Sequence, residues 1–349
     1  MTASRHPDAW PSGLLIVDKP GGMTSHDVVA RVRRLARTRR VGHAGTLDPM
    51  ATGVLVVGIE KATRLLGHLM LTEKTYEAVI RLGQSTTTDD AEGEPTGGSP
   101  AADVDSGAAL NVAAALHAEI ARLTGDIMQV PSSVSAIKVN GQRAYKLTRA
   151  GEAPELAARP VTVHEFQILG LSTEGDFLDL RARVRCSSGT YIRALARDLG
   201  AALGTGGHLT ALRRTAVGPY TIAMARTLAD LEDQQQSSER ERVNPALETV
   251  LPPGQEPQAT PAAAAVPPAA PSPVIPLAEA AAAAFPRLDL TEDGARRLAQ
   301  GARLPLPPGF PPSPGDAKDL PVAAFAPDST FVALVTAEGG LLRSLAVFV

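Results

Sequence analysis

The sequence predicts an α+β fold built on a mixed, largely antiparallel sheet. Apolar and polar residues alternate over residues 76–82 and again over residues 178–186, which is the pattern of half-buried strands. Apolar residues recur at helical spacing over residues 28–36 and 192–203. Several of the predicted strands lie closer together in the chain than the crossover helices of a parallel sheet would allow. A mixed sheet therefore suits the chain better than a doubly wound fold.

The N-terminal part of the chain contains two further predicted strands with a helix between them. Residues 14–17 and 54–59 are short apolar runs, which are typical of buried strands. Between these runs, Val28, Val32 and Leu35 mark one face of a helix whose other faces carry arginine. We expect this helix to cover the two strands.

A proline- and alanine-rich stretch divides the chain. Residues 252–276 hold nine prolines and almost no charge, which is typical of a partly extended linker. We therefore predict a large domain over residues 10–232, a linker over residues 233–284 and a small, mostly β domain over residues 285–349. The composition of the linker predicts that few contacts cross it. The small domain is expected to contain a helix near residues 292–300 and strands near residues 321–326, 330–336 and 341–349.

Composition limits the classes of function. Cys186 is the only cysteine, which excludes an internal disulfide and a cysteine-rich zinc site, and the seven histidines show no paired metal-ligand spacing. We therefore expect a reducing compartment and no metal. The longest early apolar run, residues 14–17, is too short for a signal peptide or a membrane span. The protein is expected to be cytoplasmic and to have no membrane partner.

Positive charge is concentrated in two runs, although the net charge of the chain is -3. Residues 31–40 hold six arginines and no acid, and residues 181–214 hold seven arginines against the single acid Asp198. Either run alone could be a solvated face of a helix or strand. Two such runs beside glycine-rich loops favour a polyanionic partner, and phosphate makes nucleic acid the best candidate.

The stretch "GHAGTLDP", residues 42–49, holds a carboxylate in a glycine-rich segment. One interpretation is that Asp48 caps a short helix with Pro49 at its first position. However, Gly53 and a predicted strand follow almost at once, which leaves little helix to cap. The alternative is a shaped loop in which Asp48 acts as a nucleophile, a base or a hydrogen-bond acceptor. The stretch lacks the lysine and the spacing of a nucleotide P-loop, so ATP and GTP are not expected.

A second candidate site lies in "SSGTYIRALARDLG", residues 187–200. Arg193 falls in the first turn of a predicted helix, where the helix dipole disfavours a cation. It could be a tolerated surface arginine. The functional interpretation is that Arg193 faces a buried carboxylate or a substrate phosphate, because a carboxylate in a dry pocket needs such a partner to remain ionised. Asp48 is the candidate carboxylate.

Five stretches, spread over roughly residues 13–220, form one set: "LLIVDKPGGMTSHDVV", "RRVGHAGTLDPMATGVLVVGIEKATRLL", "KTYEAVIRLGQSTTTDDAEGE", "PSSVSAIKVNGQRAYKLTRAGE" and "CSSGTYIRALARDLGAALGTGGHLTALRRTAVG". Together they resemble the successive motifs of the bacterial tRNA pseudouridine-55 synthase family, TruB. They appear in the order of that family, and the second and fifth are highly specific. Residues 285–349 resemble the family's C-terminal PUA-type RNA-binding module.

The resemblance implies a catalytic domain of the pseudouridine synthase type. It would isomerise uridine 55 in the T-loop of tRNA without a cofactor, by detaching the base from the ribose at N1 and rejoining it through C5. Asp48 would be the nucleophile, attacking either C1′ of the sugar or C6 of the base. Arg193 would pair with Asp48, and Tyr76 would pack on the base and take part in proton removal.

The resemblance also implies that the target nucleotide is flipped out of its stack. His43 would fill the vacated space, Leu212 would form an apolar pocket beneath the base, and Lys19 and Pro20 would support the catalytic loop. The remaining residues expected at the RNA are Gly42, Gly45 and Thr46 in the loop, and Lys138 and Arg143 in an RNA-gripping insertion over residues 125–152. The expected partner is the T stem-loop of tRNA, bound by a monomer that needs no guide RNA.

Two alternatives remain open at this point. The chain could be a non-catalytic RNA-binding or tRNA-folding protein on the same scaffold, or a pseudouridine synthase for another RNA, including one that needs guide RNA and partner proteins. A carboxylate beside polyanionic RNA opposes binding, so its presence in the glycine loop favours catalysis.

Overall fold

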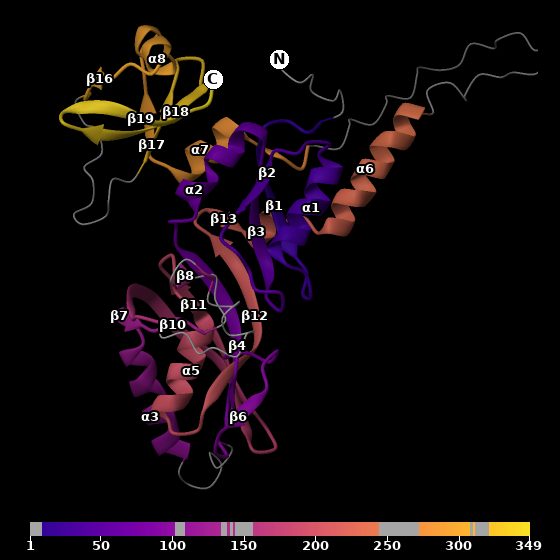
Figure 1. Cartoon of the computed structure of the whole chain (residues 1–349), viewed down its shortest axis with the longest axis vertical. Helices are drawn as coiled ribbons and strands as arrows, with labels where there is room; N and C mark the ends of the chain where they lie inside the picture. Colours follow the sequence, from indigo (N-terminus) through magenta and orange to yellow (C-terminus); the bar gives the residue numbers. More distant parts are fainter. Residues whose placement is uncertain are drawn as a thin grey trace, which may run out of the picture.

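The computed structural model describes residues 9–101, 109–133, 138–139, 142–143, 156–243, 272–307, 310 and 321–349. Figure 1 shows a long body built on one large sheet, a smaller C-terminal domain at one end of it, and helix α6 (Leu228–Val243), which projects from the side of the body. In the part of the chain that the structure describes, no helix is both long enough and apolar enough to cross a membrane.

The large sheet is mixed and mainly antiparallel, which confirms the predicted fold class. All neighbouring strands are antiparallel except one pair, β3 and β12, which run parallel. β2 (Val41–Ala44) pairs with β3, and β13 (Tyr220–Thr221) pairs with β12. From edge to edge the order is β14 (Ile275–Pro276), β1 (Gly13–Lys19), β3 (Thr52–Ile59), β12 (Gly207–Val217), β4 (Lys74–Leu82), β11 (Phe177–Cys186), β10 (Arg159–Glu174) and β7 (Gly125–Gln129).

Helices cover both ends of this sheet. Short elements outside the sheet are η1 (Glu60–Arg64), α2 (Leu66–Leu69) and a ribbon of β5 (Ser85–Thr86) with β6 (Pro95–Gly97), and longer helices lie at each end. α1 (Ser25–Leu35) begins at a capping box between Thr24 and Asp27. Its buried valines pack on apolar residues of β1 and β3, as predicted. At the other end, α5 (Ile192–Ala202) and α3 (Ala109–Arg122) lie together against β4, β11 and β12.

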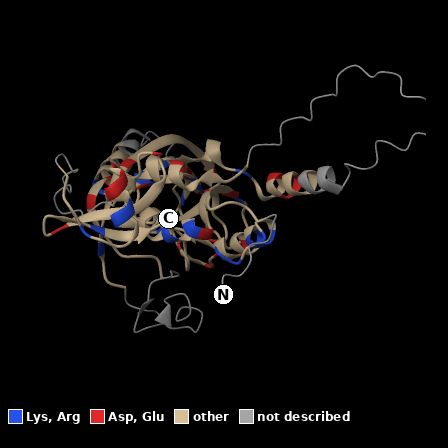
Figure 2. Cartoon of the chain, turned by 90° about the horizontal axis from the view of Figure 1, so that it is seen from above, with Lys and Arg blue, Asp and Glu red and all other residues tan. Residues whose placement is uncertain are grey.

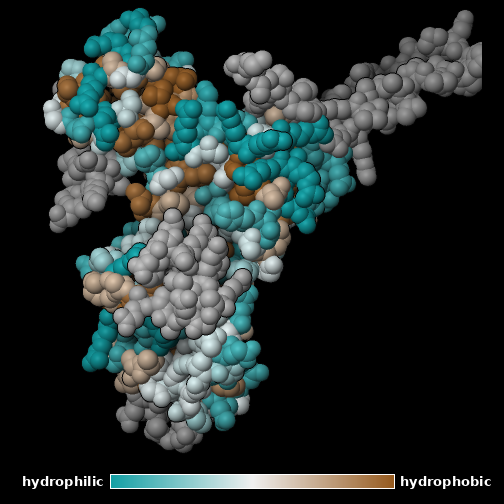
Figure 3. Space-filling model, viewed as in Figure 1, coloured by the Kyte–Doolittle hydropathy of each residue, from teal (hydrophilic) through white to brown (hydrophobic). Residues whose placement is uncertain are grey.

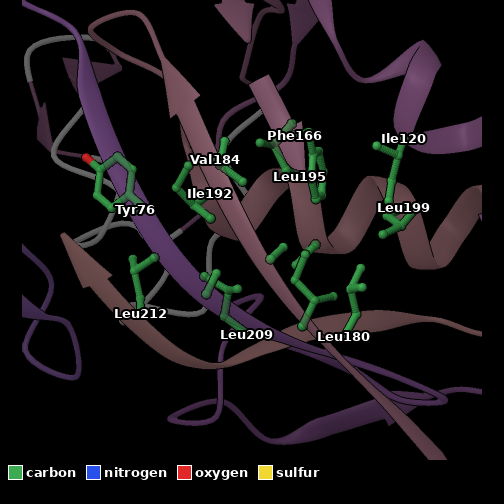
Figure 4. Close-up of a cluster of buried hydrophobic side chains, with 14 of the residues drawn as sticks. Tyr76, Ile120, Phe166, Leu180, Val184, Ile192, Leu195, Leu199, Leu209 and Leu212 are labelled. Carbon is green, nitrogen blue, oxygen red and sulfur yellow. The ribbon is translucent and has the colours of Figure 1, made fainter. Parts of the chain in front are cut away.

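The core beneath α5 reaches the centre of the sheet. The buried faces of β4, β11 and β12 meet the apolar face of α5 there, since alternate residues of each strand point toward the helix. Figure 4 shows Tyr76 and Leu212 at one end of this cluster and Ile120 and Leu199 at the other. The Tyr76 ring, which is predicted to contact the substrate, therefore lies at the edge of this core.

The parallel contact between β3 and β12 is short. It consists of two residue pairs, Arg213 with Thr52 and Arg214 with Gly53. Gly53 has a φ of +97°, and a Cβ atom there would lie 2.2 Å from the backbone oxygen of Arg214. Glycine is therefore required where the two halves of the sheet meet.

The C-terminal domain matches the sequence expectation closely. Its predicted helix is α8 (Glu292–Ala299), and its three predicted strands are β17 (Val322–Phe325), β18 (Phe331–Glu338) and β19 (Leu341–Val347). Two short strands, β15 (Arg287–Asp289) and β16 (Leu304–Pro305), complete a sheet in the order β15-β17-β18-β19-β16.

The linker is shorter than the sequence suggested. Residues 228–243 form α6, and the end of the range assigned to the linker forms β14 and α7 (Leu277–Ala284). β14 pairs with β1, and the hydroxyl of Tyr220 donates to the carbonyl of Ala280 at 2.8 Å. The prediction for residues 272–284 was wrong because a proline-rich stretch runs without a break into an alanine helix, and an alanine helix carries no apolar period.

The expectation of few contacts across the linker is also corrected. Phe331 and Phe348 of the C-terminal domain share one core cluster with Leu65 and Leu66 of the body. Lys61 Nζ donates to the Phe348 carbonyl at 2.8 Å. The C-terminal domain is therefore docked on the body through apolar packing and at least this polar contact.

The arginine run after α1 lies mainly on the surface. Arg33, Arg34, Arg39 and Arg40 are exposed, whereas Arg31 pairs with Glu232 of α6 at 2.7 Å. Figure 2 shows acidic residues on the projecting helix and basic and acidic residues interspersed over the body. Arg31 therefore serves the packing of α6, and the four exposed arginines of the run face the solvent.

Candidate active site

The stretch 42–49 folds as the end of a strand followed by a turn. Gly42 and His43 lie in β2, and Gly45, with a φ of +75°, turns the chain away from the sheet. The structure contains no helix between β2 and β3. The Ala51 N–H bonds to the Asp48 carbonyl at 3.1 Å, which closes a turn immediately before β3. The helix-cap interpretation of Asp48 is therefore replaced by the shaped loop.

Two buried side chains hold this loop from below. Ser25 Oγ accepts a hydrogen bond from the Leu47 N–H at 2.9 Å and lies 3.2 Å from the Leu47 carbonyl oxygen, to which it can donate. Lys19 Nζ donates to the Pro49 carbonyl at 3.1 Å and to the Met23 carbonyl at 2.6 Å. Burial lowers the pKa of Lys19 to about 8, while the nearby Asp48 raises it. The backbone on both sides of Asp48 is thus fixed.

Arg214 ties the loop to the sheet. Its guanidinium is buried and donates from Nη2 to the Gly45 carbonyl at 3.0 Å and from Nε to the Val54 carbonyl at 2.7 Å. Among the described residues, no carboxylate forms an ion pair with it. Tyr76 is the register partner of Arg214 on β4. Burial raises the pKa of Tyr76, and the charge and hydrogen bond of Arg214 act in the opposite direction.

A cavity of about 370 Å³ opens beside the loop. This volume lies within the range of about 300–1,000 Å³ that is usual for small-ligand sites. Its walls come from four parts of the fold: the loop at residues 45–48, the turn at Met70 and Leu71, the strand residues Lys74, Tyr76, Leu212 and Arg214, and the segment 187–193 that leads into α5.

Asp48 and Arg193 form an ion pair on the wall of this cavity. Arg193 Nε lies 3.0 Å from Asp48 Oδ2, and its Nη1 lies 3.3 Å from Asp90 Oδ2 and donates to the Thr88 carbonyl at 3.0 Å. The side chains of Arg193 and Asp90 are 5% and 3% exposed, whereas that of Asp48 is 38% exposed and reaches the cavity. Asp90 and the Thr88 carbonyl therefore hold Arg193 in place, and Arg193 in turn fixes the Asp48 carboxylate where it faces the cavity.

The pKa of the Asp48 carboxyl reflects competing influences. Burial raises it above its ordinary value, and the neighbouring negative charge of Asp90 adds to the rise. Arg193 lowers it, because the guanidinium stabilises the ionised form. The ion pair thus favours a carboxylate where burial alone would favour the neutral acid.

The start of α5 is fixed by an amide side chain. Gln129, at the end of β7, accepts from the Tyr191 N–H at 2.8 Å and donates to the Tyr191 carbonyl at 3.1 Å. One turn after Arg193, Arg197 pairs with Asp89 at 3.3 Å. Arg193 occupies the first turn of α5, as the sequence indicated.

The structure brings some of the predicted residues together and leaves others outside the cavity. Those that line it are Asp48, Arg193, Tyr76, Leu212, Gly45 and Thr46. Gly42, His43, Lys19 and Pro20 lie behind or beside the loop. The His43 ring packs edge-on against His26 at 5.3 Å, burial lowers its pKa, and its buried Nδ1 has no hydrogen-bond partner among the described residues.

Lys138 and Arg143 face each other as register partners in a small ribbon of β8 (Lys138–Val139) and β9 (Gln142–Arg143). Their side chains lie outside the described part of the structure, and so do most residues of the predicted insertion. Residues 125–129 of that range form β7, a strand of the large sheet.

Sequence reasoning missed several residues of the site. Asp90 and Arg214 stand inside stretches that carried the resemblance, but Asp90 was not singled out and Arg214 was counted only as a member of an arginine run. Lys74, Ser25 and Gln129 carried no signal, because their roles depend on the partners that the fold brings to them. Within the described ranges, no three His, Cys, Asp or Glu side chains gather as metal ligands would.

Comparisons with known proteins identify the family of the chain. The N-terminal domain of the TruB family pseudouridylate synthases matches residues 33–192, the tRNA pseudouridylate synthase B C-terminal domain matches residues 193–256, and the tRNA pseudouridine synthase II C-terminal domain matches residues 285–349. The tRNA pseudouridine synthase B of Thermobifida fusca is 54% identical over 96% of this chain and 98% of its own length. That of an Arthrobacter species is 52% identical over 97% and 96%.

A solved H/ACA ribonucleoprotein bound to a substrate RNA containing 2′-deoxyuridine has the same fold. Its matching chain has a TM-score of 0.67 at 24% identity, over 100% of this chain and 92% of that one. The family models and the two relatives span nearly the whole chain. The chain belongs to the TruB family of pseudouridylate synthases.

Proposed function

We propose that this protein converts uridine 55 in the T-loop of tRNA into pseudouridine, with Asp48 as the nucleophile. The observation that carries the proposal is the pairing of Asp48 with the buried Arg193 on the wall of a cavity that Tyr76 and Leu212 also line. The two relatives, each named a tRNA pseudouridine synthase B and about half identical to this chain, support a tRNA substrate.

The reaction is an isomerisation in which atoms and electrons balance within the nucleotide and the enzyme. The Asp48 carboxylate attacks C1′ of the ribose or C6 of the base, and the N1–C1′ bond breaks. The base turns in the cavity and a C5–C1′ bond forms. The bond to Asp48 breaks, the hydrogen on C5 leaves as a proton, and N1 gains a proton. Asp48 returns to its starting state.

The neighbouring residues act by position. Arg193 keeps Asp48 ionised and aimed into the cavity, so activation comes from placement rather than from deprotonation. Tyr76 packs on the base, gives its hydroxyl proton to N1 and, as a phenolate that the adjacent Arg214 stabilises, takes the C5 proton, so that it ends as the neutral phenol. Leu212 forms the apolar floor beneath the base.

The remaining assignments concern RNA contact. His43, in β2 beside the loop, fills the space that the flipped base leaves. Gly42, Gly45 and Thr46 let the RNA approach the loop closely, while Lys19 and Pro20 support it. Lys138 and Arg143 in the insertion contact the RNA backbone. We further propose that the chain acts as a monomer on tRNA in the cytoplasm, without guide RNA.

The direct test uses a bare tRNA transcript whose uridines carry tritium at C5. Because isomerisation removes the hydrogen from C5, the enzyme alone should release tritium from one uridine per tRNA. A transcript with cytidine at position 55 should release none. Tight binding without release would favour a non-catalytic RNA-binding protein, and release from the cytidine transcript or from another RNA would assign a different target.

A further inference from the structure

The turn between α2 and β4 places two apolar side chains at the mouth of the cavity. Met70 is 44% exposed and Leu71 is 67% exposed, and both line the cavity that contains Asp48. Figure 3 shows hydrophobic surface just below the position of α2 in Figure 1, where the chain leaves this helix. Large apolar side chains next to a polar cavity leave the free enzyme with surface that gains from being covered.

This turn is held firmly in place. Lys74 Nζ donates to the carbonyls of Met70 and Thr72, and Thr72 Oγ1 donates to the Leu69 carbonyl at 2.8 Å. Ser188, in the segment that leads into α5, donates to the same Met70 carbonyl at 2.6 Å. Contacts from β4 and from the segment before α5 therefore fix the backbone that carries Leu71.

The anchoring lysine is itself unusual. Lys74 is buried, and burial together with the charge of Arg214 lowers its pKa to about 8. A buried ammonium group is unfavourable unless carbonyl groups satisfy it, and among the described residues both hydrogen bonds of the Lys74 ammonium go to the turn. Lys74 thus restrains the turn that carries the exposed side chains of Met70 and Leu71.

The cavity defines what can reach Leu71. A nucleotide whose base occupies the cavity between Asp48 and Tyr76 leaves its neighbours in the RNA strand at the mouth, where Leu71 lies. A rigid apolar side chain can pack on the face of an unstacked base, and apolar wedges hold nucleic acids in distorted forms in this way.

We propose that Leu71, braced by Met70, is an apolar wedge that packs on the base next to the extruded uridine and holds the RNA loop open during the reaction. This proposal rests on the proposed function, because the occupant is the RNA substrate of the same cavity. The wedge acts by stabilising the flipped state and takes no part in bond making.

The test compares Leu71→Ser with Leu71→Met and with Leu171→Ser. Leu171 is 47% exposed on β10 and does not line the cavity, so it is a matched control for loss of exposed leucine. With tRNA transcript and saturating enzyme, Leu71→Ser should slow the single-turnover rate about tenfold or more, because one leucine–base contact is lost. Leu71→Met and Leu171→Ser should stay within about twofold of wild type, since each leaves the wedge in place.

A second measurement separates this proposal from the proposed function. A fluorescent base analogue is placed on the 3′ side of the target uridine, and its signal is followed on binding to Asp48→Asn with and without Leu71→Ser. Loss of the binding-induced signal with Leu71→Ser supports the wedge even if no isomerisation is ever found. An unchanged signal, an unchanged rate, or a change in affinity alone overturns it. Absence of tritium release by wild-type enzyme overturns the proposed function instead.

Discussion

Arg193 Nε lies 3.0 Å from Asp48 Oδ2, although the two residues come from opposite halves of the large sheet. The arginine is also fixed by Asp90 and by the Thr88 carbonyl, so it has little freedom to follow the aspartate. Asp48 is thereby held at one place on the cavity wall. We therefore expect the function of the site to depend on this ion pair.

Asp48→Asn should abolish pseudouridine formation while leaving tRNA affinity within a few-fold of wild type. The amide keeps the shape of the side chain but is a poor nucleophile and carries no charge for Arg193. Tritium release and filter binding on the same preparation measure the two effects. Residual activity above about one per cent would rule out Asp48 as the nucleophile.

Arg193→Lys should lower the single-turnover rate about a hundredfold or more, because an ammonium group cannot bridge Asp48 and Asp90 as the planar guanidinium does. Arg183→Lys is the matched control, since Arg183 forms an exposed pair with Glu77 at 3.6 Å and should change the rate by less than about twofold. Equal rates for the two variants would mean that Arg193 is not needed to position Asp48.

Lys19 should make the stability of the protein depend on pH. Burial lowers its pKa from 10.5 to about 8 in the folded protein, so between these values the unfolded chain binds more protons. The contribution of Lys19 to the free energy of unfolding therefore rises with pH across this window. Urea unfolding at pH 7.5 and 9.5 should show wild type gaining about 1–2 kcal/mol relative to Lys19→Met. An equal change with pH in the free energy of unfolding of the two proteins would contradict the lowered pKa of Lys19.

Truncations should distinguish the docked domain from the strand and helix that precede it. Deleting residues 287–349 uncovers the apolar surface around Leu65 and Leu66, and deleting residues 252–349 also removes β14 and α7. Calorimetry should place the melting temperature of the first truncation below that of the full chain and that of the second lower again, by about 5 °C or more at each step.

A salt series of tRNA affinities for the shorter deletion tests RNA binding by the C-terminal domain. Weaker binding with a flatter salt dependence is expected if that domain contacts phosphates. If the deletion of residues 252–349 has the same melting temperature as the full chain, β14 and α7 do not stabilise the large domain, and residues 252–284 act only as a linker.

The elements of the fold were predictable wherever local pattern and burial coincide. β4 and β11 alternate because one face of each strand meets α5, and α1 shows its valines at helical spacing because it covers β1 and β3. α7 could not be found in this way. Its buried residues, Ala280 and Ala281, and its exposed residues, Ala282 and Ala283, are all alanines, so its sequence carries no period.

The residues of the site were likewise predictable only in part. The pairing of Asp48 with Arg193 was predicted because a carboxylate in a glycine turn and a cation in a helical first turn are both unfavourable alone. Arg214, Lys74 and Ser25 are bound to backbone carbonyls or amides of distant segments. A hydrogen bond to a backbone group does not depend on the residue type of its partner, so these contacts could be identified only from the structure.

The short parallel contact at Gly53 gives the enzyme a seam. Asp48 belongs to the half that contains β3, whereas Tyr76 and Arg193 belong to the half that contains β4 and α5, and two residue pairs join β3 to β12 between them. Apolar packing also crosses this seam, since Leu47 and Ala51 belong to the core beneath α5 and Val217 packs with Val54. Opening of the seam is therefore expected to separate Asp48 from Arg193 and to disturb both cores together. Amide hydrogen exchange at Arg214 would report the fraction of open molecules, and Gly53→Ala would increase it.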